Sequence, residues 1–275
     1  MKTSGAETLS ISANIFVGQT EAPILIRPYI KNMTKSELMA VMTGGFATVA
    51  GSVLALYVLW LEKIPGIAGH MLAASIMSAP ASLVIAKLIY PETEKANSLD
   101  ELELRVEKNT ANAMDALGNG ATQGLKLAAN IGAMLVAFIS ILSMINFTLE
   151  YFLNINLQEI LGIIFSPLAW TMGIPWQEAN IVGRLMGEKI VLTELIAYGS
   201  LGDLIKNNLI SERSAIISSY ALCGFANFGS IGIQLGGIGA MAPEKRDILS
   251  KIVFKAMIGG ALASWLTATI AGILI

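Results

Sequence analysis

Long apolar stretches divide this chain of 275 residues and predict helices that cross a membrane. A spanning helix needs about 20 mostly apolar residues. The stretches of that length are residues 37–60, 67–90, 127–153, 213–241 and 248–275. Two further segments, residues 9–30 and 180–201, are apolar but interrupted by glycine and polar residues. Non-helical backbone at membrane depth needs protein or a water-filled cavity around it, so we expect both segments to be re-entrant helical hairpins.

Part of the chain occurs twice. Residues 20–52 and 193–230 each contain a Thr-Glu pair followed by Gly-Phe-Ala and then Gly-Ser. Three predicted crossings separate Glu21 from Glu194, and an odd number inverts the second copy relative to the first. Inverted repeats that are polar and Gly-interrupted at corresponding points are typical of binding sites in secondary transporters. The alternative is chance similarity between helices that use small residues for packing.

We therefore predict an all-α polytopic membrane protein, built as an inverted repeat of a re-entrant hairpin, a broken helix and a spanning helix. The excess of Lys and Arg on the side of the 27–37 loop makes that side cytoplasmic. The expected units are the first repeat at 1–96, a cytoplasmic amphipathic helix at 97–126, a scaffold-type helix with an interfacial segment at 127–175, and the second repeat at 176–275. The first repeat has no upstream helix like 127–153, so we expect an N-terminally truncated piece of a longer protein.

The composition also places the chain in a lipid bilayer. Hydrophobic residues make up 54% and charged residues 14% of the chain, whereas soluble domains carry about 25% charged residues. The net charge is −2 and the basic residues are scattered, which argues against a nucleic-acid surface. One cysteine excludes a disulfide within the chain, one histidine excludes a His-rich metal site, and common catalytic motifs are missing. We expect a multi-pass protein of the plasma or inner membrane with no cofactor, and not an enzyme.

Two kinds of polar position could carry chemistry. Glu21 and Glu194 are ionisable groups in apolar sequence, which normally line a cavity or pair with a partner. They are candidates to accept hydrogen bonds from a polar substrate, the alternative being a structural ion pair or a hairpin cap. The Gly-rich stretches 43–52 and 223–230 predict unwound backbone. Freed carbonyls and side-chain oxygens suit a small hard cation; close helix packing explains the glycines but not Asn227.

Short motifs at the hairpins and breaks carry a resemblance. They are ANIFVGQTEAP at 13–23, MTGGFA at 42–47, SAP at 78–80, PETE at 91–94 and ALCGFAN at 221–227. Together they resemble the concentrative nucleoside transporter family. The resemblance covers essentially the whole chain and corresponds to the C-terminal portion of the family, starting just before the first hairpin.

This resemblance implies a homotrimer, with a scaffold and a mobile transport domain, that moves nucleosides into the cell on a cation gradient. Residues implied to contact the nucleobase are Gln19, Thr20 and Glu21. Those implied to hold the ribose are Glu194, Asn227 and Ser230, with Val53 and Phe225 packing against the substrate. A sodium ion is implied between the first hairpin tip and the break in 37–60, bound by the side chains of Asn14 and Thr48 and the carbonyls of Val17 and Val49.

Several alternatives stay open. Thr193 stands where the family commonly has Asn, which affects the ribose contacts. A proton could replace sodium if Glu21 or Glu194 carries it. The chain could also be a truncated or non-transporting nucleoside-binding membrane module, since helices expected upstream would belong to the scaffold. Purine or pyrimidine preference is not decided by these residues.

Overall fold

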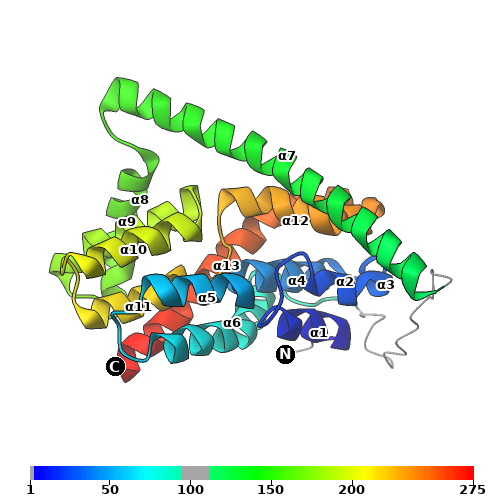
Figure 1. The fold of residues 1–275 in the computed structure, drawn as a ribbon, viewed down its shortest axis with the longest axis horizontal. Coiled ribbons are helices and arrows are strands. Elements are labelled where there is room, and N and C mark those ends of the chain that lie inside the picture. Colours follow the sequence, from blue (N-terminus) through cyan, green and yellow to red (C-terminus); the bar gives the residue numbers. More distant parts are fainter. Residues whose placement is uncertain (1–2, 95–111) are drawn as a thin grey trace.

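The computed structural model describes residues 3–94 and 112–275, which are almost entirely helical (Figure 1). The first repeat comprises α1 (Gly5–Ala13), α2 (Ala22–Leu25), α3 (Arg27–Ile30), α4 (Lys35–Ala47), α5 (Gly51–Trp60) and α6 (Ile67–Ile89). The second comprises α9 (Trp176–Val191), α10 (Glu194–Lys206), α11 (Glu212–Leu222), α12 (Phe228–Met241), the short η1 (Pro243–Lys245) and α13 (Arg246–Leu274). Between them lie α7 (Ala113–Leu153) and α8 (Leu157–Thr171). The predicted fold class is confirmed.

Both interrupted segments fold as hairpins, and their polar residues form the tips. In hairpin 1, α1 is followed by a tip at residues 14–21 and then by α2 and α3. In hairpin 2, α9 and α10 are joined by residues 192–193, and the Thr193 hydroxyl accepts from the backbone N–H of Ile196 to cap α10. A helix start leaves unpaired N–H groups, so this threonine satisfies one of them. The caps place Glu194 in the first turn of α10, at the tip.

Each repeat also contains a broken helix. The first is interrupted between α4 and α5 at residues 48–50, and the second between α11 and α12 at residues 223–227. The first break is shorter than the Gly-rich stretch 43–52 had indicated, because Gly44 and Gly45 are helical. A Cβ at Gly44 would lie 2.6 Å from Ile11 Cγ1. This glycine therefore allows α1 to pack closely on α4, as small residues do in membrane helices.

The two breaks touch each other. Gly224 lies in the second break with φ at +100°, and a Cβ there would lie 2.6 Å from the carbonyl oxygens of both Phe46 and Ala47. Both conditions require glycine. Helix α13 packs against α4, α6, α11 and α12 around this crossing. A Cβ at its Gly260 would overlap Phe46. The crossing of the breaks is thus the centre of the helical core.

Helix α7 runs across one side of the molecule, over α12 (Figure 1). It is one continuous helix from Ala113 to Leu153, so the expected boundary at residue 126 falls inside it and the described part shows no separate amphipathic helix ending there. The N-terminal portion of the expected 97–126 helix lies outside the described residues. The direction then changes by 87° between Ile139–Leu153 and Leu157–Thr171.

By length and apolarity, three helices of the described part are able to cross a membrane, or four if the bent pair counts as one. They are Lys35–Trp60, Ile67–Ile89 and Pro243–Leu274. The predicted crossing at 213–241 is present as two shorter helices, α11 and α12, separated by the break. It therefore satisfies the length requirement only when both parts are taken together.

Candidate substrate and ion site

Glu194, at the tip of hairpin 2, is the centre of a buried polar cluster. Its Oε2 accepts a hydrogen bond from Asn227 Nδ2 at 2.8 Å, and its Oε1 accepts one from the Tyr57 hydroxyl at 3.3 Å. Asn227 also caps α12, because its Oδ1 accepts from the backbone N–H of Ser230 at 2.7 Å. The cap fixes the amide with its nitrogen toward Glu194. A carboxylate offers about four acceptor positions, so this one retains capacity for further donors.

The tip of hairpin 1 contacts the same part of α12. Gln19 is buried, and its Nε2 donates to Ser230 Oγ at 3.1 Å. Gln234, one turn further along α12, donates from Nε2 to Gln19 Oε1 at 3.1 Å and to the Met42 carbonyl at 3.1 Å. The structure therefore brings Gln19, Ser230, Asn227 and Glu194 together from both hairpins and the second broken helix. These contacts connect residues expected on the nucleobase side with those expected on the ribose side.

Thr20 and Glu21 lie at the same tip but pair with each other. The Thr20 hydroxyl donates to Glu21 Oε2 at 3.0 Å. The Glu21 side chain is exposed, in contrast to the buried Glu194. Gly18 lies directly under the Glu21 carboxylate, where any Cβ would overlap Oε2. The two glutamates therefore have different surroundings, although they occupy corresponding places in the repeats.

Val53 and Phe225, the two expected apolar contacts, are partly buried and pack against the main core. Val53 lies in the first turns of α5, and Phe225 lies in the break before α12. Both therefore flank the crossing of the broken helices. Apolar side chains such as these two contact the apolar faces or edges of rings in a ligand.

The tip of hairpin 1 also packs on the first break. The backbone N–H of Gly51 donates to the Phe16 carbonyl at 3.1 Å, and the Ser75 hydroxyl donates to the Ile15 carbonyl at 3.2 Å. Asn14 begins this tip and is fully buried, yet neither its Oδ1 nor its Nδ2 has a partner among the described residues. Buried polar atoms are nearly always satisfied. The unpaired side-chain oxygen of Asn14 fits the role of a cation ligand.

The other expected cation ligands have mixed surroundings. The Thr48 hydroxyl donates to the Gly44 carbonyl at 3.0 Å, which leaves its oxygen lone pairs available. Val49 is fully buried in the break, whereas Val17 is exposed at the tip. The described residues contain no cluster of three or more His, Cys, Asp or Glu that could hold a metal ion. A cation at this place would be bound by neutral oxygens, as suits a monovalent hard ion.

Three residues of this region were missed from the sequence: Tyr57, Gln234 and Lys189. Lys189 of α9 is fully buried and donates to the carbonyls of Ala221 at 3.0 Å and Cys223 at 2.9 Å, and to the Ser264 hydroxyl at 2.9 Å. The Ala221 carbonyl belongs to the last turn of α11 and the Cys223 carbonyl to the residue that follows the helix, and a helix dipole favours a cation at this end. An isolated charge or amide in apolar sequence was the available signal for Lys189 and Gln234. Tyr57 gave no signal, because aromatic residues are common in such helices.

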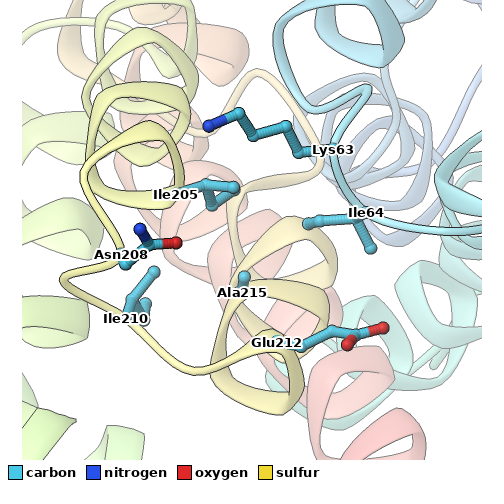
Figure 2. A pocket seen from close by; sticks show the side chains of 7 residues that line it. All are labelled: Lys63, Ile64, Ile205, Asn208, Ile210, Glu212 and Ala215. Carbon is cyan, nitrogen blue, oxygen red and sulfur yellow. The ribbon is translucent and has the colours of Figure 1, made fainter.

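Two surface hollows lie elsewhere. One, of about 220 Å³, lies where the turn after α5 meets the loop between α10 and α11; Figure 2 shows Lys63 and Ile64 on one side and Asn208 and Ile210 on the other. The second, of about 380 Å³, lies between α9 and α10 and is lined in part by Arg184, Glu188 and Asp203. None of the cluster residues around Glu194 lines either hollow.

Comparison with known proteins covers the whole chain. A family model described as "Na+ dependent nucleoside transporter C-terminus" matches residues 70–272, and one described as "Nucleoside recognition" matches residues 1–63. The chain is 44% identical over 280 residues to the Bacillus subtilis transporter YutK, covering 99% of this chain and 68% of the relative. It is 43% identical over 282 residues to the Helicobacter pylori nucleoside permease NupC, covering 99% and 66%. Mouse sodium/nucleoside cotransporter 1 is 42% identical over 295 residues, which are 100% of this chain but 45% of the relative.

Solved structures with a similar fold also match nearly the whole chain. The structure of CNTnw in an inward-facing substrate-bound state has a TM-score of 0.81 at 45% identity, covering 98% of this chain and 65% of that one. A CNTnw structure in an "intermediate 3" state has a TM-score of 0.85 at 43% identity, covering 99% and 66%. The chain thus spans about two thirds of the bacterial relatives and less than half of the mouse cotransporter.

Proposed function

We propose that this chain, which belongs to the family of Na⁺-dependent nucleoside transporters, contains the nucleoside and cation sites of a symporter that moves nucleosides across the plasma or inner membrane. Family and relatives are integral membrane transporters rather than enzymes. One observation carries the proposal: the buried Glu194–Asn227 pair lies beside the Gln19–Ser230 pair where the hairpin tips meet the second broken helix. Such clusters at the interface of inverted repeats are where transporters bind substrate.

The chemistry of the cluster suits a nucleoside. A ribose presents neighbouring hydroxyls, and the Glu194 carboxylate has acceptor positions beyond those used by Asn227 and Tyr57. Hydrogen bonds to a charged acceptor are about twice as strong as neutral ones. We assign Glu194, Asn227 and Ser230 to the ribose, and the hairpin 1 residues Gln19, Thr20 and Glu21 to the nucleobase. Val53 and Phe225 would flank the base or the sugar.

The coupling ion is proposed to be sodium, bound between the hairpin 1 tip and the first break. The unpaired, fully buried amide of Asn14 supports this choice, as does the contact of Gly51 with Phe16 that holds the tip against the break. Ligands would be the side chains of Asn14 and Thr48 and the carbonyls of Val17 and Val49. Sodium would then stabilise the hairpin tip that carries Gln19, which gives a physical route for coupling.

The arrangement in the membrane is part of the same proposal. The inverted repeats at 1–96 and 176–275 would form the substrate-carrying part, and 127–175 the scaffold side, in a homotrimer. The chain spans about two thirds of the length of the bacterial relatives. Transport is therefore proposed from the arrangement of the sites and repeats described above, and not taken over from the names of the relatives.

Uptake of labelled uridine and adenosine into proteoliposomes, with and without an inward sodium gradient, tests the function. We expect accumulation that needs the gradient. Binding without gradient-driven accumulation would support the non-transporting nucleoside-binding module instead. Accumulation driven by a proton gradient and indifferent to sodium would assign the coupling to a proton.

A further inference from the structure

A series of hydrogen bonds connects a backbone carbonyl of α4 to the proposed nucleoside site. The Met42 carbonyl accepts from Gln234 Nε2, which also donates to Gln19 Oε1, and Gln19 Nε2 donates to Ser230 Oγ, each at 3.1 Å. The side chains of Gln19, Ser230 and Gln234 are all buried. These contacts join α4, hairpin 1 and α12 at one point.

The Met42 carbonyl determines the orientation of both side-chain amides in this series of hydrogen bonds. A backbone carbonyl can only accept, so Gln234 must turn its amide nitrogen toward Met42. The second N–H of Gln234 then faces Gln19, which must turn its oxygen toward it. The nitrogen of Gln19 is thereby directed toward Ser230 and the cluster around Glu194. Reversing the Gln234 amide would place its oxygen against the Met42 carbonyl, and reversing the Gln19 amide would place its nitrogen against the Gln234 nitrogen. A buried unsatisfied group costs about 1–3 kcal/mol.

We propose that Gln234 is a positioning residue that sets the hydrogen-bonding polarity of the nucleoside site. It holds Gln19 with an N–H toward the ligand, so the site recognises an acceptor atom on the nucleobase. Ser230 accepts from Gln19 and keeps its own proton free to donate to a ligand oxygen. This inference rests on the proposed function, since it takes the ligand to be a nucleoside.

Two further features indicate that the N–H groups of Gln234 matter at position 234. A Cβ at Gly45 would lie 2.5 Å from Gln234 Nε2 and 3.1 Å from Gln19 Cβ, so glycine there makes room for the amide contact. Gln234 Oε1 is buried and has no partner among the described residues. An apolar side chain of the same length would avoid that unpaired acceptor, but it would offer nothing to Met42 and Gln19.

The test compares nucleoside analogues in Gln234→Met and the unmodified chain. Kd is measured by calorimetry at saturating sodium for uridine or adenosine, whichever binds more tightly. It is measured again for analogues in which one acceptor is weakened or removed: 2- and 4-thiouridine for uridine, which keep the N3–H donor, or the 1-, 3- and 7-deaza forms for adenosine. In the unmodified chain we expect one analogue to bind up to about tenfold more weakly, the value of one neutral hydrogen bond. In Gln234→Met we expect weaker binding of the parent nucleoside, and a ratio of the Kd of that analogue to the Kd of the parent nucleoside near one.

Gly45→Ala reaches the same amide from α4 and keeps the test available if Gln234→Met does not fold. It should also remove the discrimination, as should Gln19→Ala at the ligand end. A ratio unchanged in Gln234→Met or Gly45→Ala, with all ligands weakened equally, would mean that Gln234 acts only in packing and would overturn the proposal. Absence of discrimination in the unmodified chain would overturn it as well. Failure of the unmodified chain to bind either nucleoside would instead refute the proposed function.

Discussion

The substitution Glu194→Gln tests the ribose assignment most directly. The carboxylate accepts from Asn227 Nδ2 at 2.8 Å and from the Tyr57 hydroxyl at 3.3 Å. Asn227 is fixed as a donor by its cap on α12. A glutamine at position 194 can keep its oxygen toward Asn227 and donate its amide to the Tyr57 oxygen. The substitution therefore preserves the fold and removes the negative charge and one acceptor face.

The expected loss follows from the number of ligand bonds. Two ribose hydroxyls donating to a carboxylate form bonds worth about 1.5–3 kcal/mol each, against about 0.5–1.5 kcal/mol for neutral acceptors. Replacing both gives a loss of about 2–3 kcal/mol, which corresponds to a roughly 30- to 150-fold higher Kd for the nucleoside. Glu21→Gln should change Kd less than about fivefold, because Glu21 is exposed and glutamine can still accept from Thr20.

Calorimetric titration of detergent-solubilised protein at saturating sodium measures these values. Tyr57→Phe is the matched control at the cluster, since it removes only the longer of the two bonds to Glu194. A 2′,3′-dideoxynucleoside adds a second check: it should bind the unmodified chain poorly, and Glu194→Gln should weaken it little further. Equal and mild effects of Glu194→Gln and Glu21→Gln would refute the ribose assignment.

Three further results are expected. Asn14→Ala should raise the sodium concentration needed for nucleoside binding while leaving the nucleoside Kd at saturating sodium nearly unchanged, because linkage is reciprocal. Nucleoside binding by the unmodified chain that does not depend on sodium and strengthens at low pH would contradict the proposed sodium site. Lys189→Met should lower the Tm, since the carbonyls of Ala221 and Cys223 at the end of α11 lose this donor and each buried unpaired group costs about 1–3 kcal/mol. An unchanged Tm would show that water replaces the ammonium. Gly224→Ala should abolish monodisperse folded protein in size-exclusion chromatography, whereas Gly236→Ala, with no neighbour within 4 Å, should behave like the unmodified chain; equal behaviour would refute the crowding at the crossing.

The features predicted correctly from the sequence are those encoded within one segment. Glycine and polar residues interrupt apolar sequence at both hairpins and both breaks, and backbone at membrane depth has few ways to tolerate such interruptions. The boundary expected at residue 126 lies inside one continuous helix. A change from amphipathic to apolar composition indicates where a helix enters the membrane, but nothing there ends the helix, and α7 continues through it.

Contacts between distant segments could not be predicted in this way. Gln234 and Met42 are 192 residues apart, and Tyr57 and Glu194 are 137 apart. No local pattern in either segment specifies the partner. In the sequence Lys189 is an isolated charge within the second hairpin, and only the fold places it on the carbonyls of Ala221 and Cys223. Residues that carry an unusual polar group can be identified from sequence, but what they bind depends on how the repeats cross.

That crossing also shows why the two repeats differ chemically. Aligning Gly-Phe-Ala of both repeats makes the Met42 and Gly44 carbonyls correspond to those of Ala221 and Cys223. The first pair receives neutral donors, from Gln234 and Thr48. The second pair receives the ammonium of Lys189.

The ammonium of Lys189 at the second break repels a further cation there, and in a buried site of low dielectric that repulsion is strong. At the first break the donors are uncharged, and the amide of Asn14 in the adjoining hairpin tip has no partner among the described residues. The electrostatics of the two breaks therefore support placing the exchangeable sodium in the first repeat. They also leave Glu194, beside the second break, available to a neutral ligand with hydroxyl donors.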